Sequence, residues 1–167
     1  MTDSAQESVA RSLALRDLVR HRDHVLRTID GLGESELDHV AAPSGWTPRS
    51  MLSHLIHDVE SFWLRAVLGG DGTAIDQLRD GWRAPPLPGP ALREAYRRET
   101  ALGDAALARA DLNAPPLWWP PVEVFDAPRL LTGWEILLRV IDETAVHAGH
   151  LDMAREAMDG HQDLVVG

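Results

Sequence analysis

Helical periodicity bounded by capping residues is the feature that most limits what this chain of 167 residues can fold into. Apolar side chains recur three and four residues apart over long segments, a spacing that places them on one face of a helix. No stretch alternates apolar and polar residues over the length of a strand. The pattern therefore predicts an all-α fold.

Capping residues and helix breakers divide this pattern into four long helices. Thr47 is a favoured N-cap with a proline behind it, and Thr132 begins a capping box with Glu135. Ser4 and Glu7 have the same capping-box spacing, which predicts the start of the first helix. The predicted helices cover about residues 4–29, 47–68, 90–110 and 132–158, with a helical turn at 34–39.

Two of the connections between these helices are long and rich in proline. Residues 71–90 contain four prolines and several glycines, and residues 111–129 surround Trp118 and Trp119 with prolines, so both are expected to be loops. Four long helices with two long connections predict one domain over residues 1–167. Its expected architecture is a four-helix bundle with long crossover loops rather than a simple up-and-down series.

Composition excludes several classes of function. The formal net charge is −10 and the basic residues are scattered, whereas nucleic-acid binding needs a clustered basic surface. The chain has no cysteine, so disulfides, thiolate ligands and a protein thiol nucleophile are absent. No apolar run approaches the roughly 20 residues of a membrane span, and the N-terminal residues do not resemble a secretory signal. The sequence therefore predicts a cytoplasmic protein that binds neither nucleic acid nor membrane.

The fourth predicted helix carries the most informative group of polar residues. Glu143 and His147 are four residues apart, and His150 follows three residues later, so the three lie along one face. Their neighbours on that face are mostly apolar, and a carboxylate and an imidazole are costly there unless they are paired or bind a metal. A divalent ion would satisfy both groups. A buried Glu–His hydrogen bond and a partly solvated helix edge are the alternatives.

The second predicted helix offers His54 and His57 as further candidates. His54 shares a helical face with Asp58 and other polar residues, which predicts exposure to solvent. Spacing alone does not choose between the two histidines as a third ligand. The remaining histidines show no pattern of partners and are expected at the surface: His21, His24, His39 and His161.

The tryptophans divide into two groups. Trp63 and Trp134 fall inside predicted helices and are expected in the core. Trp118 and Trp119 lie in the second proline-rich loop, where they are expected either to cap a pocket at the bundle mouth or to fasten the loop to the core.

Two segments resemble the DinB-like superfamily, and within it the mycothiol-transferase-like branch. The first consists of Gly45-Trp46-Thr47-Pro48, His54-Leu55, Val59-Glu60 and Trp63, and the second of residues 142–152 followed by Arg155-Glu156 and Asp159-Gly160. The resemblance implies a four-helix bundle, often dimeric, that holds a metal. Matched residue by residue, it places the ligands at His54, Glu143 and His147, with His57, Asp58 and His150 as candidates for the surrounding shell.

The resemblance also implies a reaction. A divalent metal, Zn with Ni, Fe or Mn as alternatives, would keep one position open for a low-molecular-weight thiol such as mycothiol, which is then transferred to an electrophilic small molecule. A metal-dependent hydrolase on the same site and a non-enzymatic dimeric metal-binding protein are the alternatives. Arg139 stands where relatives in this branch often have a histidine, so a proton relay through that position is not expected here.

Overall fold

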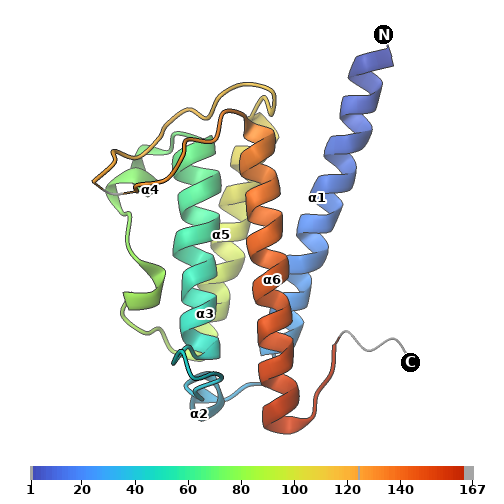
Figure 1. Ribbon diagram of the computed structural model, residues 1–167. Helices are drawn as coiled ribbons and strands as arrows, with labels where there is room; N and C mark the ends of the chain where they lie inside the picture. Colours follow the sequence, from blue (N-terminus) through green and yellow to red (C-terminus); the bar gives the residue numbers. More distant parts are fainter. Residues whose placement is uncertain (1, 124, 164–167) are drawn as a thin grey trace.

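The computed structural model describes residues 2–123 and 125–163, and every regular element within them is helical (Figure 1). The bundle is formed by α1 (Thr2–Ile29), α3 (Pro48–His54) with its continuation η1 (Leu55–Leu68), α5 (Gly89–Arg109) and α6 (Gly133–Asp159). Shorter segments lie in the connections: α2 (Glu34–Leu37), α4 (Gly72–Asp76) and η2 (Gly81–Arg83). The predicted all-α fold is confirmed. Within that part of the chain, none of the helices has the length and hydropathy that crossing a bilayer would require.

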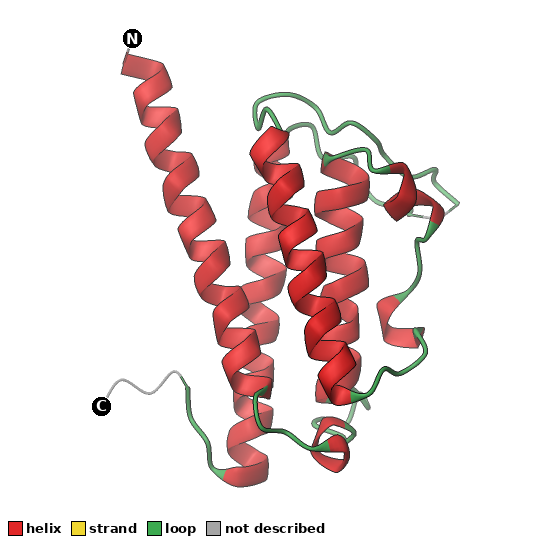
Figure 2. Cartoon of the chain, turned by 180° about the vertical axis from the view of Figure 1, so that it is seen from behind, coloured by secondary structure: helices red, strands yellow, loops and turns green. Residues whose placement is uncertain are grey.

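The four long rods pack with η1 and α5 running in one direction and α1 and α6 in the other (Figure 1). α6 packs against both α1 and η1, and η1 packs against α5. Residues 69–88 must therefore return along the outside of the bundle, and residues 110–132 cross one of its ends (Figure 2). These are the two long crossover connections that the sequence predicts.

The predicted capping residues form the expected hydrogen bonds. Thr47 Oγ1 accepts from the backbone N–H of Ser50, at 3.2 Å. Thr132 Oγ1 accepts from the backbone N–H of Glu135 at 3.3 Å, and the Glu135 carboxylate accepts in return from the N–H of Thr132 at 2.9 Å. α6 ends where Gly160 takes a left-handed conformation with φ of 76°. A side-chain cap at Thr132 and the left-handed backbone of Gly160 thus set the two ends of the helix that carries Glu143 and His147.

Two predictions about where helices occur are wrong. α1 begins at Thr2, so Ser4 lies inside the helix rather than at its N-cap, although the Ser4 side chain itself falls outside the described part. The connection expected to be a plain loop contains α4 and η2, each capped by an aspartate: Asp71 for α4 and Asp80 for η2. These caps begin helices too short to show a periodic apolar pattern.

The second rod changes geometry after His54, where α3 gives way to the wider, π-type turns of η1. Eight of its nine buried side chains recur as pairs every four residues, Ala66 being the ninth: Leu55 and Ile56, Val59 and Glu60, Trp63 and Leu64, Val67 and Leu68. The four-residue repeat is longer than the 3.6-residue period of an α-helix, and wider turns lengthen the period. The second rod therefore departs from a regular α-helix from Leu55 onward.

A buried ion pair joins α1 to η1 across the core. The Arg22 guanidinium donates to both carboxylate oxygens of Glu60, at 2.7 and 2.6 Å, and also to Asp104 of α5 at 2.6 Å. Burial raises the pKa of the Glu60 carboxyl, which Arg22 opposes. The pair needs Gly103, because a Cβ there would stand 2.9 Å from Glu60 Oε2. Three of the four rods are thus tied together by one guanidinium.

His24 is buried, and its prediction as a surface residue is wrong. Its Nε2 lies 3.6 Å from an Asp152 carboxylate oxygen on α6 and 3.5 Å from one of Asp163, which follows that helix. Its partners come from distant parts of the chain, so no local spacing could reveal them. Trp63 lies in the core and Trp134 packs against it, as predicted.

Breaking the buried pair on one side is expected to destabilise the fold strongly. Arg22→Leu leaves the Glu60 carboxylate buried without its cation, which should lower the free energy of unfolding by roughly 3–5 kcal/mol in urea titrations. The double variant Arg22→Leu/Glu60→Leu should recover most of this loss, because no buried charge remains. A single variant as stable as the wild type would contradict the importance assigned to the pair.

Candidate metal centre

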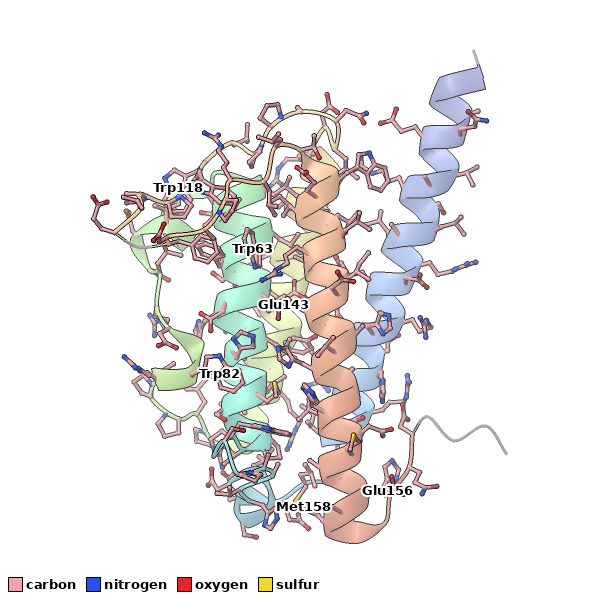
Figure 3. All side chains as sticks on the ribbon, in the orientation of Figure 1. Trp63, Trp82, Trp118, Glu143, Glu156 and Met158 are labelled. Carbon is pink, nitrogen blue, oxygen red and sulfur yellow. The ribbon has the colours of Figure 1, made fainter. Side chains whose placement is uncertain are left out.

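Three donor side chains from two distant segments converge between α3 and α6. His54 is the last residue of α3, and Glu143 and His147 lie one turn apart on α6. Figure 3 shows Glu143 between α6 and the second rod. Glu143 Oε2 lies 3.2 Å from His147 Nε2 and 3.9 Å from His54 Nε2. The three ligand atoms all lie within 4.8 Å of one another.

The position of His54 is fixed from behind by Asp58 on the next turn. His54 Nδ1 lies 2.8 Å from Asp58 Oδ2, and a carboxylate only accepts, so Nδ1 carries the proton and Nε2 presents its lone pair. Asp58 is itself held by the backbone N–H of Gly81, at 3.1 and 3.0 Å from its two oxygens. An oriented imidazole with a carboxylate behind it is the usual support of a metal-binding histidine.

His54 is covered by the connection that follows η1. The Trp82 ring stacks on the His54 imidazole, with centroids 4.5 Å apart and planes 19° apart. The His54 side chain is only 14% exposed, so the exposure predicted from its polar helix face is wrong. The cover comes from η2, which sequence periodicity does not place. Nε2 of His54 is buried and has no hydrogen-bond partner among the described residues.

The charges of the site favour an ionised Glu143. The neighbouring imidazoles of His147 and His54 hold the pKa of the Glu143 carboxyl well below its usual range, and burial opposes this. Arg139 contributes a salt bridge of 3.1 Å to Oε1 of Glu143. Burial lowers the pKa of His54, but the nearby carboxylates of Asp58 and Glu143 outweigh it, so its pKa is raised overall.

The donor set fits a small divalent cation. Zinc bonds of about 2.0–2.2 Å in tetrahedral geometry separate neighbouring ligand atoms by roughly 3.4 Å, close to the 3.2 and 3.9 Å distances from Glu143. Nε2 of His54 is a buried polar atom without a hydrogen-bond partner among the described residues, and a bound cation would supply the partner that it lacks. Two imidazoles and one carboxylate suit zinc and related metals.

The three other residues proposed for the surrounding shell have different places. Asp58 contacts His54 directly, as described above. His150 lies on the far side of His147, with 3.4 Å between their Nδ1 atoms. His57 does not belong to the cluster, and burial together with Arg79 lowers its pKa. Among the described residues, neither His57 nor His150 offers a fourth donor to the site.

A cavity of about 600 Å³ opens from the donors, and both His54 and Glu143 line it. Its other walls come from η1, from residues 78–82, from the second long connection and from α6: Asp58, Val59, Phe62, Trp63, Leu78, Arg79, Asp80, Trp82, Phe125 and Arg139. Sequence reasoning missed Trp82, Phe62 and Phe125, because single aromatic residues in a loop or helix carry no spacing signal. Trp119 packs against Trp63 with centroids 6.0 Å apart and does not line the cavity, so it fastens its loop to the core.

The fold and this site define an all-helical bundle with three metal-type donors at the end of a largely apolar cavity. A family model described as mycothiol-S-transferase matches residues 14–160, and the chain belongs to that family. The match supports a transferase-like function related to mycothiol. No curated protein and no solved structure matches the chain. The homodimer and the cytoplasmic location expected from the sequence stay predictions.

The close approach of η2 to α3 predicts that Gly81 tolerates no side chain. A Cβ at Gly81 would lie 2.7 Å from His54 Cα and from the Ser53 carbonyl oxygen, and 2.8 Å from Asp58 Oδ2. Backbone atoms cannot yield, so Gly81→Ala should push η2 outward and cost about 1–3 kcal/mol of stability. The His54 imidazole should also lose the ring-current shift that Trp82 imposes, which NMR detects.

Gly72→Ala is the matched control, because a Cβ at Gly72 meets nothing within 4 Å. It should leave the His54 resonances in place. Unchanged His54 resonances in Gly81→Ala would show that η2 does not cover the imidazole in the way described.

Proposed function

We propose that this protein is a divalent-metal-dependent enzyme that transfers a low-molecular-weight thiol, mycothiol or a close analogue, to an electrophilic small molecule. The observation that carries the proposal is the convergence of His54, Glu143 and His147 at the end of a cavity, with the buried Nε2 of His54 left without a partner. Family membership supplies the thiol, and the donor set supports the metal.

The residues present leave room for a ligand beside the cation they would hold. With one carboxylate and two neutral imidazoles, a divalent ion would retain a charge near +1. When bound, such an ion would stabilise the ionised form of a thiol that reaches it. Zinc fits the donors best, and Ni, Fe or Mn also accept them. The chain has no cysteine, so the sulfur nucleophile comes from the cosubstrate.

The protein's own residues keep the donors in place and shape the cavity beside them. Asp58 holds the proton on Nδ1 of His54 and so leaves the lone pair of Nε2 available to a cation. Arg139 engages Oε1 of Glu143, which leaves Oε2 to face the two imidazoles. The rings of Trp82 and Phe62 help to exclude water from the space where sulfur and electrophile must meet.

Metal content tests the three donors directly. The wild type is expected to bind one zinc ion per chain, and His54→Ala, Glu143→Gln and His147→Ala should each lower the affinity by more than roughly 100-fold, beyond the effect of losing a supporting residue. Competition with a chromophoric chelator gives the affinities. His57→Ala is the control, since it removes a histidine three residues from His54 that lies outside the cluster.

Asp58→Ala adds a graded comparison to the same series. It keeps all three donors but removes the support of His54, so the affinity should fall by roughly 10–100-fold. If the three donor variants retain metal as tightly as His57→Ala does, the ligand assignment is wrong.

Thiol binding separates the proposed transferase from the alternatives. Cobalt-substituted protein titrated with mycothiol should show a new sulfur-to-cobalt charge-transfer band that saturates at one thiol per site. The same titration of Glu143→Gln serves as the background. A cobalt spectrum that stays unchanged at saturating thiol would contradict thiol transfer and favour hydrolysis or a structural metal.

A further inference from the structure

The cavity has two chemically different ends. One end holds the donors His54 and Glu143 with Trp82 beside them. The other end is lined by Phe62, Trp63 and Phe125. Val59 and Leu78 add apolar surface to the lining of the cavity. A reaction between two molecules in this cavity therefore offers each of them a distinct place.

The aromatic end is a cluster of rings in mutual contact. Phe62 lies 4.8 Å from Trp63 and 5.3 Å from Phe125, measured between ring centroids, and Trp63 lies 5.6 Å from Phe125. The interplanar angles are 78°, 59° and 83°, so the rings meet edge to face or tilted rather than stacked. Such an arrangement presents both ring faces and ring edges, the surfaces with which a further ring makes favourable contacts.

The cluster is fixed from outside and connected to the donors. Trp119 packs against both Trp63 and Phe125, with centroids 6.0 Å away in each case. The Arg139 guanidinium lies 5.9 Å from the Trp63 ring centroid and also forms a salt bridge with Glu143. Arg139 therefore stands between the aromatic end and the donor end, within reach of a molecule that spans both.

We propose that the end of the cavity formed by Phe62, Trp63 and Phe125 is the electrophile subsite and that it selects electrophiles with a planar aromatic body. The assignment of the bound molecule as the electrophile rests on the proposed function, because the thiol sulfur would occupy the donor end. The ring contacts themselves require neither metal nor thiol. An aliphatic body of equal size fills the same space but forfeits the ring–ring contacts.

An aromatic α,β-unsaturated ketone illustrates the reaction that such a site permits. The sulfur lone pair forms a C–S bond at the β carbon, and the electron pair of the C=C bond moves toward the carbonyl oxygen. The proton lost by the thiol ends on the α carbon, so nothing leaves and no oxidant or reductant is needed. The Arg139 guanidinium lines the cavity where the displaced negative charge would develop.

Equilibrium binding of unreactive ketones tests the subsite without any thiol. Calorimetric titration of the metal-loaded protein compares 4-phenylbutan-2-one with 4-cyclohexylbutan-2-one. Burial alone favours the more apolar cyclohexyl compound, so a preference for the phenyl compound reports ring contacts. We expect the phenyl compound to bind about two- to tenfold more tightly. Phe62→Leu should abolish that preference, and Phe125→Leu should reduce it.

Trp118→Leu is the matched control, because Trp118 lies in the same connection as Phe125 but does not line the cavity. It should keep the wild-type preference, and circular-dichroism melting verifies that each variant is folded. Equal or tighter binding of the cyclohexyl compound to the wild type would overturn the proposal, as would a phenyl preference that survives in both phenylalanine variants. A phenyl preference without a thiol-induced cobalt band would support the aromatic site while contradicting thiol transfer.

Discussion

The contact between the Gly81 backbone and the second helical rod is the constraint on which the site depends. It is close enough that only a glycine fits, and it brings the Gly81 N–H onto Asp58 while the next residue, Trp82, stacks on His54. One short turn of chain thereby covers the imidazole, fixes its proton on Nδ1 through the carboxylate, and leaves Nε2 directed at α6. Without this cover, His54 would be a polar side chain on a solvent-facing side of the helix. It would be free to change rotamer, and water could satisfy its ring nitrogens at little cost in free energy.

The opposite side of the site owes its geometry to helical spacing alone. Residues four apart on α6 bring the Glu143 carboxylate within 3.2 Å of His147 Nε2 without help from any loop. Arg139, one turn earlier, takes the other carboxylate oxygen and so gives the two oxygens different partners. Glu143 therefore faces the imidazoles through a single oxygen, which limits how much of a cation's coordination shell the protein could fill. The cavity lies beside this cluster, and among the described residues neither His57 nor His150 adds a further donor to it.

Sequence reasoning predicted the features that local chemistry determines. The caps at Thr47 and Thr132 and the left-handed Gly160 set helix ends by interactions within a few residues, so their spacing was sufficient. The pairing of Glu143 with His147 follows from the same local geometry. The choice of His54 over His57 does not follow from local geometry, because it depends on a family resemblance and on a cover supplied by η2. The burial of His24 arises from packing between distant parts of the chain, and the widened turns of η1 depart from the 3.6-residue period that sequence reasoning assumes.

The molecule separates the elements that hold the donors from those that complete the cavity. All three donors lie on long helices whose ends are capped and whose inner faces belong to one core, the placement that holds a constellation most precisely. Trp82 and Phe125 come instead from the two long connections, where changes of length and sequence are tolerated. Because Arg22 and Glu60 bind α1 and η1 through the core, the spacing of the rods does not rely on those connections. Under the proposed function, the donor end and the proposed electrophile subsite could therefore change independently of each other. Trp82 of η2 is the exception, because this one residue both covers His54 and forms a wall of the cavity.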